Sequence, residues 1–443
     1  MPVVLELRPD RRRQAMEGFG ASGAWWAQAV GGWPEEARAE ILRLLYSKTE
    51  GLGMTIYRYN LGAGSKESGR GHFPNPNRRA SSFLREDGSY DWGRDAQAVW
   101  CLEEAARLGA DEAVLFANSP PERWTVTGTA QGKLPFRANL KRAHEGDFAR
   151  YVLDVAEHFL ARGIPVRYIS PVNEPFGPWI EKAGQEGCHY HPAGVRRLMR
   201  RFAGELERRP ALRDVRLAGA ENNDLRLMNK TYTRAVLGDP ALRARLDGID
   251  VHGYVFGPLA FLKGVKRRFR RYMDRRWPGV PIRMSEWTHM QGGRDYGMDS
   301  ALEQCRVMME DLSVLEAVSW QCWVAVSEVD FCDGLIYINE KIRTFELTKR
   351  YFAFGSFTKF VPRGSVRVEL DCPAPGVNAL AFLTPEGKTV VILRNPGEEI
   401  ELSLGREGAA ALYVTDDERD LERETAALEG FTLPGRSVCT LVW

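Results

Sequence analysis

The feature that most constrains the fold is a regular alternation of short apolar segments with longer amphipathic segments. The apolar segments have the length of strands, whereas the amphipathic segments carry apolar residues at i, i+3 and i+4, as helices do. Eight strands are predicted, at residues 15–20, 54–62, 111–119, 166–174, 215–222, 248–254, 281–287 and 317–323. Eight alternating units predict a (β/α)8 TIM barrel of the α/β class. A doubly wound open sheet is the alternative, because periodicity does not tell whether a sheet closes.

The pattern changes after residue 360. Short alternating runs such as SVRVEL, NALAFL and TVVILRN follow one another there, separated by turns that contain Gly and Pro. They predict a small all-β, sandwich-like domain over residues 361–443, after a barrel over residues 15–360. Residues 1–14 alternate in the same way, so we expect them to add a strand to the β domain.

Composition excludes several function classes. The chain has 61 Lys and Arg against 59 Asp and Glu, so no global positive field favours nucleic acid as a partner. No apolar run approaches the length of a membrane span, and the N-terminus lacks the order of a signal peptide. We therefore expect a cytoplasmic protein, unless the chain was trimmed from a secreted one. Seven scattered cysteines without a C-x-x-C pair indicate neither a disulfide framework nor a zinc site.

The segment EGFGASGAWW contains a G-x-G-x-x-G formed by Gly18, Gly20 and Gly23. A dinucleotide-binding fingerprint needs a buried strand before it and an acidic residue about 20 positions later, at the end of a second strand. The preceding RPDRRRQAM is too charged for such a strand, and Glu40 lies in a predicted helix. We therefore reject the fingerprint and expect a tight turn at the end of the first strand. That turn would present three side chains to the cleft, Ser22, Trp25 and Trp26.

Polar side chains concentrate at the predicted C-terminal ends of the strands, where a barrel builds its active site. They are Arg58, Asn60, Asn173, Glu174, Glu221, Asn222, His252, Tyr254, Glu286, Trp320 and Gln321. Glu174 and Glu286 are predicted to end strands four and seven, across the barrel mouth from each other. Two facing carboxylates are what glycosidic cleavage requires. The sequence gives no distance between them, so retaining and inverting geometries both stay open.

Two glutamate motifs and three flanking motifs carry a family resemblance. They are SPVNEP at 170–175, MSEW at 284–287, GFGASGAWWA near the start, NSPPERW at 118–124 and YFAFGSFTKFVPRGSVRV at 351–368. Together they resemble glycoside hydrolase family 30, of the clan A retaining β-glycosidases. The resemblance implies a carbohydrate substrate and a covalent glycosyl-enzyme, with no cofactor and no metal. It further implies that Glu174 is the acid/base and Glu286 the nucleophile.

The same resemblance implies roles for neighbouring residues. Asn173 would donate to the sugar 2-hydroxyl, Arg58 would hold the nucleophile ionised, and His252 and Tyr254 would flank it. Trp320 would form part of the sugar platform. Because Arg58 is cationic, we expect it to lower the pKa of Glu286, while the less compensated Glu174 titrates higher.

Other residues compete for a role at this site. Glu221 is a rival carboxylate that also fits a structural role, and Asn118 lies at the predicted barrel mouth. Further candidates for sugar contact are Trp25, Trp26 and Trp124, because indole faces stack on pyranose rings. Two clusters are expected to be ordinary loops rather than metal or sugar sites: Cys188, His189 and His191, and Glu328, Asp330 and Asp333.

The prediction is a retaining β-glycoside hydrolase. The AWW run resembles the galactanase branch and favours β-1,6-galactan, with xylanase or β-xylosidase and β-1,6-glucanase activity as alternatives. A non-catalytic sugar-binding protein and a metal-dependent barrel hydrolase are alternatives from other classes. Endo or exo action and the oligomeric state are not predicted.

Overall fold

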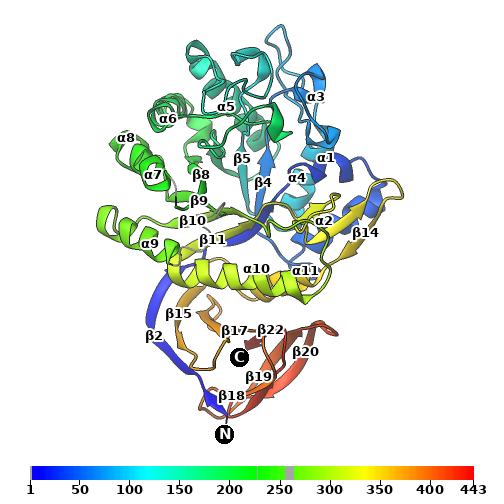
Figure 1. Cartoon of the computed structure of the whole chain (residues 1–443), viewed down its shortest axis with the longest axis vertical. Coiled ribbons are helices and arrows are strands. Elements are labelled where there is room, and N and C mark those ends of the chain that lie inside the picture. Colours follow the sequence, from blue (N-terminus) through cyan, green and yellow to red (C-terminus); the bar gives the residue numbers. More distant parts are fainter. Residues whose placement is uncertain (1, 227, 255–263) are drawn as a thin grey trace. The chain divides into compact units, whose positions relative to one another are not determined.

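The computed structural model describes residues 2–226, 228–254 and 264–443 (Figure 1). The chain divides into two compact units. One comprises Gly20–Arg43 and Thr55–Trp287, and the other comprises Met1–Phe19, Leu44–Met54 and Thr288–Trp443. None of the helices in the described ranges is both long and apolar enough to cross a membrane. The domain limits expected at residues 14 and 360 stay a prediction.

Alternating strands and helices build the unit around Thr55–Trp287. Its strands pair in parallel in the orders β3–β4–β5–β6–β7 and β8–β9–β10. Their bounds are β3 (Gly18–Ser22), β4 (Ile56–Asn60), β5 (Glu112–Phe116), β6 (Val166–Ser170), β7 (Arg216–Leu217), β8 (Ala220–Asp224), β9 (Ile249–Tyr254) and β10 (Ile282–Trp287). They belong to a nine-stranded sheet in the described part of the chain. The register places Glu286 opposite His252.

The fifth predicted strand is interrupted. Its halves β7 and β8 are the two outermost strands in the order of the nine-stranded sheet, and only Ala218 and Gly219 separate them in sequence. The sheet therefore begins and ends in the same segment of chain. This arrangement confirms the predicted α/β barrel fold, because a doubly wound open sheet has two unrelated edge strands.

Helices follow the strands of this unit (Figure 1). They are α1 (Trp26–Val30), α2 (Glu35–Tyr46), α3 (Ser65–Ser68), α4 (Ala96–Leu108), α5 (Glu145–Ala161), α6 (Pro192–Leu206), α7 (Asn229–Leu237), α8 (Pro240–Arg243) and α9 (Val265–Arg276). The longest of these, α5, buries Phe148, Val152 and Phe159 at helical spacing and carries Asp147 in its first turn, where a negative charge stabilises the helix.

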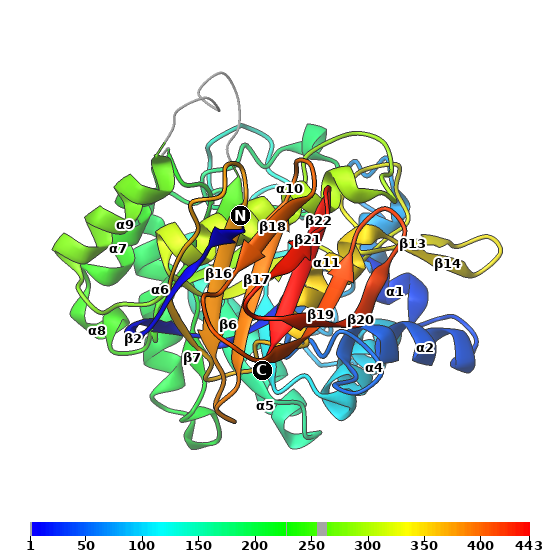
Figure 2. The same ribbon diagram turned by 90° about the horizontal axis from the view of Figure 1, so that it is seen from below.

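A β-sandwich built from both ends of the chain forms part of the second unit (Figure 2). Its strands are β1 (Val3–Val4), β2 (Glu6–Ala15), β15 (Val366–Asp371), β16 (Asn378–Leu383), β17 (Thr389–Asn395), β18 (Ile400–Ser403), β19 (Ala409–Thr415), β20 (Asp420–Ala427), β21 (Phe431–Leu433) and β22 (Ser437–Val442). One sheet has the order β2–β15–β16–β17–β22–β19–β20, and the other β1–β18–β21. Apolar residues such as Val391, Leu402 and Leu441 form their shared core.

The rest of the second unit includes α10 (Met298–Glu310), which continues as a π-helical turn over Asp311–Leu315, and the buried strand β11 (Ala317–Cys322). The segment after β11 forms a small sheet. It consists of β12 (Val326–Ser327), β13 (Ile336–Asn339) and β14 (Thr344–Leu347). The acidic residues Glu328, Asp330 and Asp333 lie between its first two strands. Helix α11 (Lys349–Thr358) packs with α10 on the larger sandwich sheet.

Candidate active site

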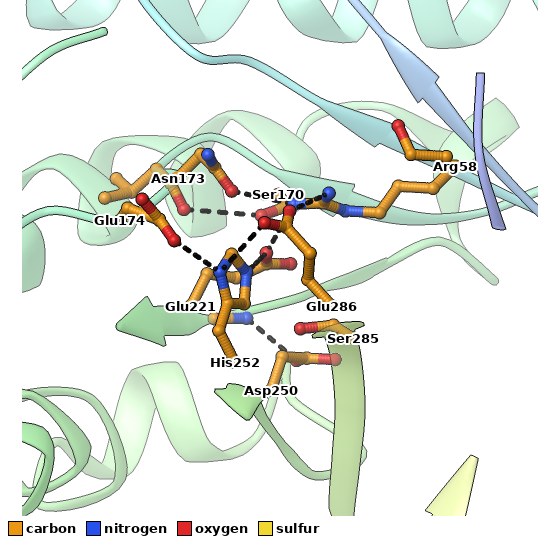
Figure 3. Close-up of polar contacts among 12 residues, drawn as sticks. Arg58, Ser170, Asn173, Glu174, Glu221, Asp250, His252, Ser285 and Glu286 are labelled. Carbon is orange, nitrogen blue, oxygen red and sulfur yellow. Dashed lines mark hydrogen bonds and ion pairs between the residues drawn. The ribbon is translucent and has the colours of Figure 1, made fainter. Parts of the chain in front are cut away.

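The C-terminal ends of the parallel strands bring together charged and polar side chains that are far apart in sequence (Figure 3). They are Arg58 of β4, Asn173 and Glu174 after β6, Glu221 of β8, His252 and Tyr254 of β9, and Glu286 of β10. All seven were predicted from their positions at strand ends. Their contacts form one continuous network inside the first compact unit.

Arg58 is the centre of this network and is completely buried. Its guanidinium donates to Glu286 Oε2 at 2.6 Å, to Asn173 Oδ1 at 2.7 Å and to Glu221 Oε2 at 2.7 Å. Burial acts to lower the pKa of Arg58, but the negative charges of Glu221 and Glu286 outweigh it and raise the pKa. The guanidinium therefore stays charged and binds two carboxylates at once.

His252 is the second buried cation. Its Nδ1 lies 3.0 Å from Glu174 Oε1 and 3.5 Å from Glu286 Oε1, and its Nε2 lies 2.9 Å from Glu221 Oε2. Burial acts to lower the pKa of His252, but the charge of Glu286 and the hydrogen bonds to Glu174 and Glu221 raise it to about 10. At neutral pH the ring is an imidazolium, and both of its nitrogens donate to carboxylates.

The carboxyl groups of Glu221 and Glu286 are both buried, but their pKa values are shifted in opposite directions. Burial acts to raise the pKa of Glu221, but Arg58 and His252 outweigh it and lower the pKa to about 2. For Glu286, burial and the charges of Glu174 and Glu221 outweigh both cations, so its pKa is raised. The expectation of a lowered pKa for Glu286 was therefore wrong. Arg58 does act in that direction, but the cost of burying the charge is larger.

Charge balance accounts for these directions. Three carboxylates share two cations, so full ionisation leaves one uncompensated negative charge in a buried site, and one proton makes the cluster neutral. A buried charge without a partner is costly, which favours retention of that proton. The cluster is therefore suited to hold one exchangeable proton among its carboxylates.

The two predicted catalytic carboxyl groups lie close together. One carboxylate oxygen each of Glu174 and Glu286 and a ring nitrogen of His252 lie within 4.8 Å of one another. Tyr254 Oη donates to Glu286 Oε1 at 3.0 Å. The Glu174 side chain is 13% exposed and that of Glu286 5%. This short separation fits a retaining glycosidase, with carboxyl groups about 5–5.5 Å apart, and not an inverting one, at about 6.5–9.5 Å.

Strained backbone holds two of the acidic residues. Glu174 has φ of 45° and Glu221 has φ of 48°, in the left-handed region that residues other than glycine seldom occupy. The backbone N–H of Glu174 donates to the carbonyl oxygen of Glu221 at 2.9 Å. Such strain persists only where the surrounding contacts hold it, and it is frequent at active sites. The two acids are thus fixed relative to each other by the main chain as well as by His252.

A row of amides orients Asn173. Its Nδ2 donates to Asn118 Oδ1 at 2.9 Å, and Asn118 Nδ2 donates to Asn60 Oδ1 at 3.2 Å. With Arg58 bound to the Asn173 oxygen, the orientation of this amide is determined from both ends. Sequence reasoning assigned no role to Asn60, although its position at the end of β4 was a usable signal.

The glycines of the GFGASG segment allow close packing, and the expected turn follows them at Ala24 and Trp25, after the end of β3. A Cβ at Gly20 would lie 2.1 Å from the Ile56 carbonyl oxygen, and one at Gly23 would lie 2.4 Å from Tyr57 Oη. The segment from Gly18 to Ser22 is a fully buried strand. Both Gly20 and Gly23 therefore lie against β4, where any side chain would clash.

Of the three side chains expected to face the cleft, only that of Trp25 is partly exposed to solvent. Trp25 is half-buried, and the Arg78 guanidinium lies 5.1 Å from the centre of one of its rings. Trp26 is buried and donates from Nε1 to the Ser22 carbonyl oxygen at 2.9 Å. The Ser22 hydroxyl is buried and accepts from the Ala24 N–H. Ser22 and Trp26 are therefore not presented to the cleft as expected.

Two other predicted aromatic contacts are packing residues. Trp124 is 9% exposed and stacks on His144 at 6.3 Å. Trp320 of β11 is completely buried, and its Nε1 donates to Asp311 Oδ2 at 3.0 Å while its ring packs against Phe354. Trp320 leaves no ring face for a sugar, so the structure does not support the expected platform there.

Metal binding is disfavoured by the hydrogen bonds of the cluster. Glu174, His252 and Glu286 are close enough to offer three ligand atoms. However, both His252 nitrogens are engaged with carboxylates, and a metal would have to displace a proton from a group with a pKa of about 10. In the GCHYHP segment the nearest imidazole nitrogens of His189 and His191 are 3.5 Å apart, and the Cys188 thiol contacts the His189 carbonyl oxygen.

Comparison with known proteins agrees with this geometry. Residues 2–237 and 285–337 match the profile described as O-Glycosyl hydrolase family 30, and residues 364–441 match the Glycosyl hydrolase family 30 beta sandwich domain. An endo-β-1,6-galactanase of Hypocrea rufa is 26% identical over 421 residues, which cover 89% of this chain and 81% of that protein.

Solved structures share the fold. A conserved exported protein from Bacteroides fragilis superposes with a TM-score of 0.89 at 23% identity, with 99% of this chain and 100% of that chain covered. The catalytic domain of xylanase C from Talaromyces cellulolyticus gives a TM-score of 0.77 at 17% identity, with 99% of each chain covered.

Proposed function

The chain belongs to glycoside hydrolase family 30 and is a retaining O-glycosyl hydrolase, and on this premise we propose that Glu174 is its acid/base, Glu286 its nucleophile and β-1,6-galactan its substrate. The observation that carries the residue assignment is the approach of Glu174 and Glu286 to within 4.8 Å between carboxylate oxygens. That separation is shorter than the about 6.5–9.5 Å of an inverting enzyme, which supports direct attack on the sugar by one carboxylate.

In the first step an oxygen of Glu286 attacks the anomeric carbon as the bond to the leaving oxygen breaks, and Glu174 gives that oxygen its proton. Arg58 and Tyr254 donate to the two oxygens of Glu286 and orient the carboxylate for attack. His252 donates to Glu174 Oε1, which leaves Oε2 as the oxygen that carries the proton. The Glu174 side chain is also the more exposed of the two, as a group that must meet the leaving chain should be.

In the second step the ionised Glu174 takes a proton from water, the water oxygen bonds to the anomeric carbon, and Glu286 is released. In the glycosyl-enzyme Glu286 is an uncharged ester and Glu174 is ionised, so Glu174 and Glu221 balance the charges of Arg58 and His252 and the cluster stays neutral. The fixed positive charges of Arg58 and His252 stabilise that state without reorganisation.

The choice of β-1,6-galactan is supported by the galactanase relative, whose similarity extends over most of both chains. A half-buried Trp25 beside Arg78 supports sugar stacking near the first strand. The expected cytoplasmic location stays a prediction.

The experiment measures products from wild type, Glu286→Gln and Glu174→Ala. Substrates are β-1,6-galactan, β-1,6-glucan, glucuronoxylan and aryl β-glycosides, and the configuration of the first product is followed by NMR. We expect a retained configuration and loss of about four orders of magnitude in Glu286→Gln. Glu174→Ala should fail on galactan but still form the glycosyl-enzyme from aryl glycosides, whose leaving groups need no proton.

Arg142→Gln, an exposed residue outside the network described above, is the control for expression and folding. Preference for xylan or β-1,6-glucan would replace the substrate while keeping the mechanism. Unchanged activity in Glu286→Gln would reject the nucleophile, and an inverted product would reject the double displacement.

A further inference from the structure

The loop that follows Glu174 is hydrogen-bonded to a second loop. The Glu174 carbonyl oxygen accepts from Trp179 Nε1 at 2.7 Å, and the Trp179 carbonyl oxygen accepts from the Gly132 N–H at 2.8 Å. Gly132 also forms a parallel bridge with Ile180. Segment 126–139 is therefore held at a fixed place relative to Glu174, through contacts that lie within one compact unit.

Phe136 of this segment belongs to an aromatic cluster with Phe176 and His189. Phe136 is 46% exposed, and its ring centre lies 5.7 Å from those of both Phe176 and His189. Phe176 is two residues after Glu174. Phe136 has φ of 57°, a conformation that bulky residues rarely adopt and that points to a functional constraint. Exposed phenylalanine rings offer apolar faces that stack on pyranose rings.

The same segment also lines a hollow of about 770 Å³. Three cationic residues, Lys133, Arg137 and Lys182, line it together with one acidic residue, Glu181. All four are exposed, and within the described part of the chain the three cations take part in no ion pair. The hollow therefore has an excess of positive charge that is not neutralised by neighbouring side chains.

The floor of this hollow is rigid. Asn139 Nδ2 donates to the carbonyl oxygens of Thr129 and Gln131, and Thr127 Oγ1 donates to the Gln131 carbonyl oxygen. Gln131 in turn donates from Nε2 to the His72 carbonyl oxygen. A preformed surface loses little entropy when it binds a ligand.

We propose that the Phe136 and Phe176 rings and the cationic hollow form a leaving-group subsite for a carbohydrate chain that carries uronic acid carboxylates. The inference rests on the proposed role of Glu174, because the acid/base gives its proton to the leaving oxygen and the residues beside it meet the leaving chain. The rings bind sugar faces, and the planar Arg137 fork with the two lysines binds carboxylate.

Glycosyl transfer tests this subsite directly. In the second step an acceptor hydroxyl replaces water: its oxygen bonds to the anomeric carbon, its proton passes to Glu174, and Glu286 is released. The donor is the aryl β-glycoside that the enzyme hydrolyses fastest. The two acceptors are a disaccharide with one glucuronate residue and the same disaccharide after carboxyl reduction.

We expect wild type to transfer about tenfold more efficiently to the glucuronate acceptor than to the reduced acceptor at low salt. This preference should disappear in about 0.5 M salt, because salt at that concentration screens interactions between exposed charges. The triple variant Lys133→Gln, Arg137→Gln, Lys182→Gln should lose the preference. Arg142→Gln, an exposed arginine outside the hollow, is the matched charge control and should retain it. Phe136→Ala should weaken transfer to both acceptors several-fold.

Hydrolysis of the aryl glycoside is measured in each variant, and Arg142→Gln, outside the hollow, should hydrolyse it at the wild-type rate. Equal transfer to both acceptors by wild type, or no transfer to either while the donor is hydrolysed, would overturn the subsite proposal. A donor that is not hydrolysed at all would instead reject the proposed function, so the two failures are distinguishable.

Discussion

The first compact unit contains two groups of charged side chains in opposite environments, one buried and the other exposed to solvent. Around Arg58 and His252 the charged groups are buried, with nitrogen–oxygen distances of 2.6–3.0 Å between the paired groups. The three carboxylates and two cations there become neutral overall when one proton is bound. Around Arg137 they are exposed and unpaired among the described residues. Buried pairs set protonation states and geometry, whereas exposed charges are screened and serve mainly to attract a ligand. We therefore assign catalysis to the buried group around Arg58 and ligand binding to the exposed group around Arg137.

The largest effect should follow from removing the cation that two acids share. Arg58→Met leaves Glu221 and Glu286 without their guanidinium partner, and loss of one partner of a buried ion pair costs about 3–5 kcal/mol. We expect the free energy of unfolding in urea to fall by that amount, with activity lost. Arg142→Met, at the protein surface, should change it by less than about 0.5 kcal/mol. Equal stability of the two variants would mean that the buried network contributes little.

A smaller effect is expected from Glu221→Gln. Glutamine keeps the shape but removes the charge, so the free energy of unfolding should fall by about 1–3 kcal/mol. Because Glu221 is one of the groups that raise the pKa of His252, that pKa should fall from its value of about 10. NMR titration of the His252 ring measures it. A pKa that does not move would show that Glu286 and Glu174 alone keep His252 charged.

The pH dependence of stability tests the same cation. His252 has a pKa of about 10 in the folded protein and about 6.5 when unfolded, so between these values the native state binds the extra proton. Its contribution to stability is complete below about pH 6.5 and is lost as pH rises toward 10, at up to about 1.4 kcal/mol per pH unit. Unfolding measured from pH 6.5 to 10 should show a steeper loss in wild type than in His252→Gln. Parallel curves would contradict the raised pKa.

The smallest effect should come from the exposed group. Arg137→Gln should change the free energy of unfolding by less than about 0.5 kcal/mol, because its side chain is exposed and makes no ion pair among the described residues. Thermal unfolding of the purified variant measures this. A loss above 1 kcal/mol would mean that Arg137 has a structural role, and would weaken the contrast between the two charged groups.

Strand positions were predictable where burial made the sequence signal strong. Strand β5 is buried along its whole length, and its residues 113–116 form a continuous apolar run. Strand β20 has a weak sequence signal because its segment DLERETAA is mostly exposed and rich in charged residues, which are depleted in strands. It is held in place by pairing with β19 along its whole length. The sequence of β20 alone does not indicate this pairing.

Some features of the candidate site were likewise predictable from the sequence, and others were not. That Glu174 follows one strand and Glu286 lies at the end of another was predicted from periodicity, and parallel strands bring such ends to one face. The burial of Trp320 and Trp26 did not follow, because an aromatic residue at a strand end has the same sequence signature whether it packs inward or faces a ligand. The direction of the Glu286 pKa was wrong for a related reason, since a neighbouring cation can be inferred from sequence but the desolvation that opposes it cannot.

Local periodicity and turn chemistry were enough to predict the order of strands and helices, a β-sandwich, and acidic and basic residues at the strand ends. Other features depend on long-range packing: Glu221 pairs with both Arg58 and His252, Asn118 orients Asn173, and Gly20 and Gly23 allow contact with β4. These contacts join atoms from distant parts of the chain. Their energies depend on exclusion of water, a property of the packed molecule that no single segment carries.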